Sequence, residues 1–175
     1  MSARKLVALC CALWPGAAAP VAPAGAVVPG PPNLPLDAAE QVAGVADPAA
    51  IAPAPEVAMV SAVNRARAKR GRRPLGHSSS LNRSAHRYAA WMLRRDYYGH
   101  LLRIRAGGRY RRIGEALAMH FGWRSRIRRT VRSWLSSPTH RALLLSGRFR
   151  ELGAGRATGR FGGRRATTWV LHLGG

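Results

Sequence analysis

Apolar residues recur with helical spacing in three segments of the chain, and each segment predicts an amphipathic helix. The first covers residues 56–71. The second has the most regular spacing, and its apolar face comprises Leu81, Ala85, Tyr88, Ala89 and Met92. The third is marked by Ile127, Val131, Trp134 and Leu135. A fourth, shorter helix is predicted after Ser137 and Pro138, because serine is a common N-cap residue and proline favours the first helical position.

The pattern changes to that of strands near the C-terminus. Leu152-Gly153-Ala154-Gly155 begins a predicted strand, and glycines between residues 159 and 163 predict a turn. Residues 167–173 are β-branched and apolar, which predicts a buried strand. Helices followed by a hairpin indicate an α+β domain in which helices cover a small antiparallel sheet.

The first residues of the chain have the order of a secretory signal. Arg4 and Lys5 precede a run of about ten apolar residues, and small residues follow at 24–26. We therefore predict a signal peptide over residues 1–26 and a protein that is secreted or associated with the cell envelope. Retention of this segment as a membrane anchor is an open alternative, although its prolines disfavour a spanning helix.

Both cysteines of the chain, Cys10 and Cys11, lie in the predicted signal. The mature protein is therefore expected to have no disulfide bonds, no thiol nucleophile and no thiolate metal ligands. Residues 27–55 are rich in alanine and proline, which predicts a disordered linker. The folded domain is thus expected to cover residues 56–175.

Charge is distributed unevenly along the chain. Its 175 residues include 29 Lys and Arg but only 7 Asp and Glu, and the formal net charge is +22. Residues 65–175 hold 27 basic and 3 acidic residues, whereas residues 6–64 hold no Lys or Arg. Because arginine binds phosphate and carboxylate groups with two hydrogen bonds, one hypothesis is an electrostatic polyanion binder. Its partner would be an acidic polysaccharide, an anionic lipid or extracellular DNA. The alternative is that genomic composition produced the arginines and that they only form a solvated surface.

The few acids of the domain are more informative than its many arginines. Glu115 is flanked by apolar and small residues, so its carboxylate needs partners, because an unpaired buried charge is costly. These partners are either backbone N–H groups or an arginine, or else the histidines of a polar pocket. His100 follows the second predicted helix, and His140 lies in the first turn of the fourth, where the helix dipole disfavours a charged imidazole. No metalloprotease, phosphate-loop, dinucleotide or nucleophile-elbow motif occurs in the sequence.

Five short segments follow one another in an order that is informative. They are Val60–Arg67, Gly99-His100, Gly114–Ala118, the segment Ser133–Arg141 with its Trp-x-x-Ser-Pro-x-His-Arg pattern, and Leu152–Gly155 with the later Trp169 strand. Together they resemble the CAP superfamily (cysteine-rich secretory, antigen 5 and pathogenesis-related 1, or SCP-like), in its cysteine-free bacterial branch. The resemblance runs from about Glu56 to Leu173.

The resemblance implies an α-β-α sandwich with a surface cleft lined by His100, Glu115 and His140. In the family such a cleft can hold a divalent metal, commonly zinc, so the same three residues are the candidate ligands of a Zn²⁺ ion. Asn64, Trp134 and Trp169 are expected to have structural roles.

The chain also departs from the family pattern at two places. Ala116 stands where the family usually has asparagine beside the glutamate. The last strand lacks the Gly-His motif that many eukaryotic members use for a second cleft histidine. His172 lies nearby in sequence, but the sequence does not register it onto that position.

The function that the resemblance implies is that of a secreted bacterial CAP-domain protein. Its cleft would bind an envelope or extracellular ligand without catalysis or with weak metal dependence. Family members are linked to lipid or sterol binding, to envelope roles and, in a few cases, to proteolysis. An enzyme of this kind would use metal- or histidine-assisted hydrolysis with Glu115 as base, but no nucleophile motif supports it. A structural adhesion domain with a vestigial cleft is a further alternative, and specific DNA recognition is not expected.

Overall fold

The computed structural model describes residues 54–107 and 110–175, and within them the chain forms four helices and four strands. In chain order these are α1 (Pro55–Ala68), β1 (Gly76–His77), α2 (Ser79–Arg94), β2 (Ile113–Phe121), α3 (Ile127–Ser136), α4 (Pro138–Leu145), β3 (Glu151–Phe161) and β4 (Arg164–Gly174). The predicted signal peptide and nearly all of the predicted linker lie outside the described residues. Among the helices that are described, none is long and apolar enough to span a membrane.

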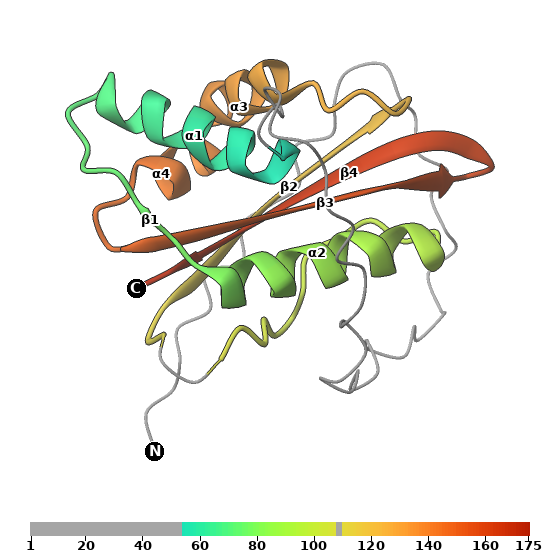
Figure 1. Ribbon diagram of the computed structural model, residues 1–175, viewed down its shortest axis with the longest axis horizontal. Helices are drawn as coiled ribbons and strands as arrows, with labels where there is room; N and C mark the ends of the chain where they lie inside the picture. The colour runs from blue at the N-terminus through green and yellow to red at the C-terminus, as the bar shows by residue number, and fades with distance from the viewer. Residues whose placement is uncertain (1–53, 108–109) are drawn as a thin grey trace, which may run out of the picture. The chain divides into compact units, whose positions relative to one another are not determined.

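The strands form one sheet in the order β1-β3-β4-β2. Strands β3, β4 and β2 are antiparallel neighbours along their lengths, as the sequence predicts for the C-terminal hairpin. Figure 1 shows α2 on one face of this sheet and α1, α3 and α4 on the other. The predicted α-β-α sandwich is therefore confirmed.

Two strands carry no clear signal in the sequence. Residues 113–121 form β2, although alanine and glycine interrupt the alternation that marks a half-buried strand. Strand β1 has only two residues and pairs in parallel with the start of β3, so the sheet is mixed at this edge and not purely antiparallel as predicted. The β3–β4 turn is also tighter than predicted, because it is made by Gly162 and Gly163, which both have positive φ.

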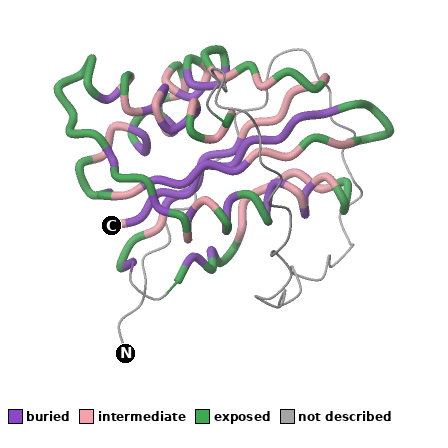
Figure 2. The backbone as a smooth tube through the Cα atoms, in the orientation of Figure 1, coloured by how far each residue is buried: buried purple, intermediate pink, exposed green. Residues whose placement is uncertain are grey.

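The core lies on both faces of the sheet, where β4 is buried along most of its length and β2 and β3 are each buried over four successive residues (Figure 2). Side chains of α1, α3 and α4 pack on one face around Trp134 and Trp169. On the other face, α2 lies directly on β3 because two strand residues are glycines. A Cβ atom at Gly153 would overlap the α2 backbone at Leu81 and Asn82. A Cβ atom at Gly155 would overlap it at Ala85 and His86. The Leu-Gly-Ala-Gly segment is thus required by close helix–sheet packing.

Candidate functional site

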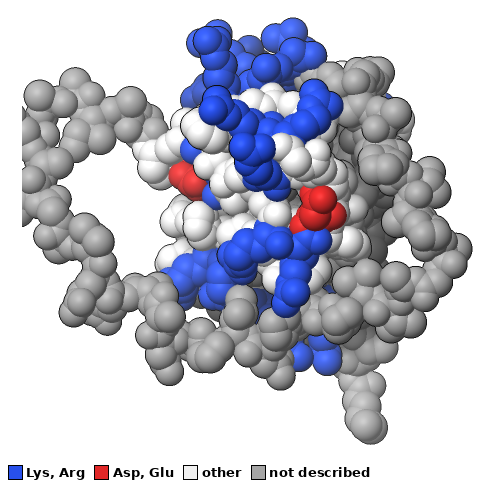
Figure 3. Space-filling view, turned by 90° about the vertical axis from the view of Figure 1, so that its right-hand side faces the viewer, with Lys and Arg blue, Asp and Glu red and all other residues white. Residues whose placement is uncertain are grey.

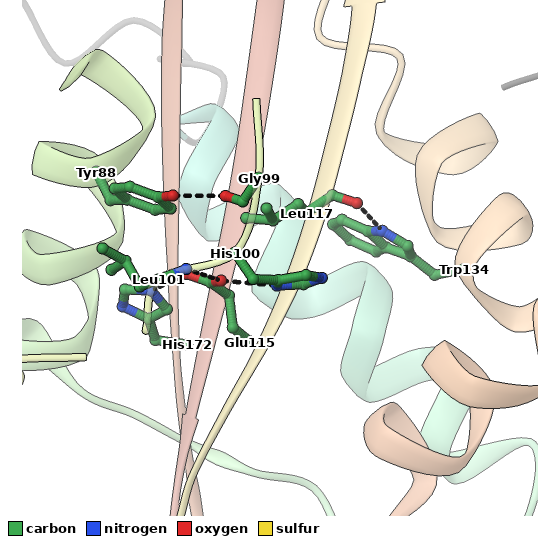
Figure 4. A network of polar contacts seen from close by, with 8 residues as sticks. All are labelled: Tyr88, Gly99, His100, Leu101, Glu115, Leu117, Trp134 and His172. Atoms are coloured by element: carbon green, nitrogen blue, oxygen red, sulfur yellow. Dashed lines mark hydrogen bonds and ion pairs between the residues drawn. The ribbon is translucent and has the colours of Figure 1, made fainter. Parts of the chain in front are cut away.

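Glu115 lies on β2 with its side chain buried, and it is paired in register with His172 on β4. Its Oε1 accepts hydrogen bonds from His100 Nδ1 at 2.8 Å and from the Leu101 backbone N–H at 3.1 Å. Its Oε2 accepts one from His172 Nε2 at 3.0 Å. Figure 4 shows the two imidazoles on either side of the carboxylate. The two expectations for Glu115 are thus both met in part, since its partners are histidines and a backbone N–H.

These donors decide the protonation state of Glu115. Burial alone would raise the pKa of this carboxyl, but the hydrogen bonds from His100 and His172 hold the pKa below its ordinary value. An ionised carboxylate can only accept hydrogen bonds, so both imidazoles donate an N–H to it. Glu115 is therefore a buried anion, and it fixes which ring nitrogen of each histidine carries a proton.

His100 is placed by contacts on both of its sequence neighbours. Tyr88, on α2, donates a hydrogen bond from its hydroxyl to the Gly99 carbonyl at 2.5 Å, while the N–H of Leu101 binds Glu115. The His100 side chain is 14% exposed and that of Glu115 only 3%. His100 is accordingly the most exposed side chain that binds Glu115, although its Nε2 is itself buried.

His172 belongs to the same network, although the sequence does not reveal it. Its Nδ1 is 2.8 Å from the hydroxyl of Ser84 on α2, so a chain of hydrogen bonds runs from Ser84 through His172 and Glu115 to His100. A serine, a histidine and an acid in series suggest a hydrolase, but Ser84 is 6% exposed and His172 is fully buried. Because Ser84 and His172 are buried, we interpret this series of hydrogen bonds as holding the His100 side chain in position. The signal that would have found His172 is the strand register, which sequence spacing alone does not provide.

His140 is fully buried in the first turn of α4. Its Nδ1 lies 3.0 Å from the Ser137 hydroxyl, and its Nε2 has no hydrogen-bond partner among the described residues. Burial, and secondly the nearby His100, lower the pKa of His140. The neutral imidazole predicted from the sequence agrees with this direction. The causes are burial and the neighbouring His100, whereas the prediction relied on the helix dipole.

The sequence from residue 60 to residue 173 matches the family model described as the cysteine-rich secretory protein family, CAP. The chain belongs to the CAP family. No curated protein is significantly similar to it in sequence. Two solved CAP-like structures show the same fold at low identity. An outer surface protein from Borrelia burgdorferi is 20% identical, with a TM-score of 0.57 over 67% of this chain and 90% of its own. Schistosoma mansoni venom allergen-like protein 4 is 16% identical, with a TM-score of 0.51 over 69% and 87% of the two chains.

In this CAP domain the three candidate zinc ligands do not form one ligand set. Among the described residues, no three His, Cys, Asp or Glu side chains are grouped so as to hold a metal ion. Both carboxylate oxygens of Glu115 already accept hydrogen bonds. Oε1 accepts from His100 and from the Leu101 N–H, and Oε2 accepts from His172. Glu115 therefore does not fit as a ligand. Its arrangement fits the carboxylate that orients a histidine from behind.

The structure shows a hollow at another place in the CAP domain. It measures about 430 Å³ and is lined by Arg72, by residues of α4 that include Arg141, and by Ser146 and Gly147. None of these residues belongs to the histidine–glutamate network. Its position therefore differs from that expected for a cleft at His100, Glu115 and His140.

The residues expected to be structural make anchoring contacts. Asn64 donates to the Leu75 carbonyl and accepts from the Leu75 N–H, both at 2.9 Å, which ties α1 to the chain before β1. Trp134 donates from its indole N–H to the Leu117 carbonyl at 2.8 Å and so fixes α3 to β2, two residues beyond Glu115. Trp169 donates to the Ser125 carbonyl at 2.8 Å.

Proposed function

We propose that this CAP domain is a non-catalytic binding module that contacts an envelope or extracellular ligand at the surface around His100. The observation that carries the proposal is the hydrogen-bonded series behind His100. Three buried residues, Ser84, His172 and Glu115, position the side chain of His100, which is 14% exposed. Burial of Glu115 and Ser84 supports binding over hydrolysis, because neither group is open to a substrate.

Secretion is part of the same proposal. Its support is the order of charged, apolar and small residues over positions 1–26. The Borrelia burgdorferi structure is described as an outer surface protein, which agrees with an extracytoplasmic place for this chain. A metal ion is not needed for the proposed binding.

A sedimentation experiment with purified peptidoglycan tests the proposal. We expect the protein to co-sediment at about 0.3 M salt, where exposed charges are screened. His100→Ala should weaken this binding by about tenfold. The matched control is His86→Ala, which changes an exposed histidine of α2 and should have no effect. Equal loss in both variants, or no binding by the wild type, would contradict the proposal.

A second candidate function is electrostatic binding of polyanions. It is favoured by the face in Figure 3, where Lys and Arg side chains gather with only small acidic areas between them. Retention on heparin should then fall steeply as salt increases. Elution from heparin at low salt would instead show that the arginines only form a solvated surface.

A further inference from the structure

The loop that follows β2 is held by an unusual series of side-chain contacts. Four successive backbone carbonyls each accept one hydrogen bond from a side chain of the sheet. The pairs are Gly122 with Thr167 Oγ1 at 2.7 Å, Trp123 with Arg156 Nη2 at 2.8 Å, Arg124 with His120 Nε2 at 2.5 Å and Ser125 with Trp169 Nε1 at 2.8 Å. The Gly122 N–H also donates to the Arg165 carbonyl at 2.8 Å. Strands β2, β3 and β4 thus all hold this loop in one conformation.

This fixed loop displays Trp123 to solvent. The side chain is 56% exposed, and it is the one exposed large aromatic among the described residues. The guanidinium of Arg165 lies over its ring, 4.4 Å from the centroid. Because exposure of an indole is unfavourable in water, a loop built to display one points to a partner that covers it.

Basic residues lie on this loop and on the strands that hold it, and together with the indole we call this group the Trp–Arg patch. It comprises Trp123, Arg124, Arg126, Arg156, Arg164 and Arg165. Arg165 lies over the indole, Arg156 binds the Trp123 carbonyl, and the guanidinium of Arg164 lies over the ring of Phe121, 3.7 Å from the centroid. Burial, and to a smaller extent the charges of Arg126, Arg156 and Arg129, lower the pKa of His120 beneath the loop. The nearby acid is Asp96, whose carboxylate accepts from the Gly162 N–H of the β3–β4 turn at 2.6 Å. Figure 3 faces this end of the sheet and shows its predominantly basic surface.

We propose that the Trp–Arg patch docks the protein on an anionic phospholipid surface. Tryptophan favours the headgroup region of a bilayer, where its apolar ring is buried and its N–H stays hydrated. Arginines beside it bind lipid phosphates, and each basic residue near an anionic surface strengthens the attachment. The inference deepens the polyanion-binding candidate by naming its partner, and it does not involve the His100 network.

The geometry favours a bilayer over a single-stranded nucleic acid. Proteins that bind single strands stack successive bases on several aromatic rings. Here one indole is exposed among the described residues, and Arg165 already covers one of its faces. The patch lies where the β3–β4 turn forms an end of the sheet (Figure 1), and such an end can touch a flat surface.

Fluorescence of the full chain with lipid vesicles tests the proposal. Trp14 is changed to phenylalanine in every sample, and the indoles of Trp91, Trp134 and Trp169 are buried. We expect vesicles with about one third phosphatidylglycerol to shift the Trp123 emission to the blue, and brominated lipid to quench it. Neither effect should occur in the Trp123→Phe variant or with pure phosphatidylcholine.

Two variants with equal loss of charge separate the patch from general basicity. Arg164→Gln/Arg165→Gln should weaken vesicle binding about tenfold, whereas Arg83→Gln/Arg87→Gln, on the exposed face of α2, should change it little. Equal weakening in both, or no response of Trp123 to anionic vesicles, would overturn the proposal. Quenching of Trp123 by single-stranded DNA without any response to vesicles would overturn it in favour of nucleic acid. Heparin retention without a vesicle response would leave polyanion binding standing and remove only the lipid partner.

Discussion

The contact that organises the candidate site is the one between the Glu115 carboxylate and the N–H groups of His100 and His172. Each of these groups would be costly to bury alone, and together they satisfy one another. The fixed protonation of His100 is a consequence of this pairing. Because this pairing depends on a few side-chain atoms, substitutions of single residues can test it.

Removal of the Glu115 carboxylate should destabilise the fold. Glu115→Ala leaves three donors without their acceptor, namely the His100, His172 and Leu101 N–H groups. We expect the free energy of unfolding, measured with urea, to fall by about 3 kcal/mol. His86→Ala, on the exposed face of α2, should change it by less than about 0.5 kcal/mol. A Glu115→Ala variant as stable as the wild type would show that the network contributes nothing to folding.

His140 should make stability depend on pH. Because its pKa is lowered in the folded protein, the unfolded chain binds a proton first as the pH falls below about 6.5. The neutral imidazole makes its full contribution to the free energy of unfolding above that pH. This contribution is lost as the pH decreases toward the pKa of His140 in the folded protein. His140→Gln should therefore reduce the decline in unfolding free energy between about pH 7 and pH 5. An unchanged pH profile in this variant would contradict the assignment.

The part that Glu115 plays in any metal binding can be separated from that of the histidines. If Zn²⁺ binds to the two histidines without Glu115 as a ligand, its uptake, measured by calorimetry, should be abolished in His100→Ala/His140→Ala. Glu115→Gln should weaken uptake by only about ten- to a hundredfold, as is typical of a group that orients a ligand. Uptake that survives the double histidine change would place the ion elsewhere, and no uptake by the wild type would show that this chain lacks the expected cofactor.

At the scale of secondary-structure elements, the packing of α2 on β3 depends on the absence of two Cβ atoms. The sequence indicates α2 well, because its apolar positions repeat regularly, and the structure places it at Ser79–Arg94. The same sequence does not indicate β2, the strand that carries Glu115, because its alanines and glycine have no preference for a strand. Pairing of β2 along its full length with β4 stabilises β2 instead.

Gly155→Ala should be strongly destabilising. The added Cβ would overlap the α2 backbone at Ala85 and His86, where no flexible side chain can move aside. We expect a loss of about 3 kcal/mol in unfolding free energy, measured by thermal or urea denaturation. Gly159→Ala on the same strand is the matched control, because its Cβ would meet only the Leu93 side chain at 3.4 Å or more. Similar losses in both variants would refute the close-packing explanation.

At the scale of the whole molecule, charge is the dominant feature. Residues 65–175 hold 27 basic and 3 acidic residues, and Glu115 is buried, so the surface repels itself. This repulsion opposes folding at low ionic strength, whatever the arginines bind.

Salt should therefore stabilise the protein. We expect the Tm to rise by about 5 °C when NaCl increases from about 20 mM to about 0.5 M, because screening reduces the repulsion. In Arg83→Glu/Arg87→Glu the net charge is lower and the rise should be smaller. A Tm that falls with salt would mean that attractive ion pairs dominate the surface.

The sequence by itself determined the helices, the C-terminal hairpin, the family and two members of the network, His100 and Glu115. These follow from local periodicity and from motifs of a few adjacent residues, such as the segment around Trp134 and His140. Only the tertiary structure decided that His172 and Ser84 belong with Glu115, and that Trp123 is displayed among arginines from distant segments. The physical reason is register. Which side chains face one another across β2, β3 and β4 is set by pairing between distant segments, and no local pattern records it.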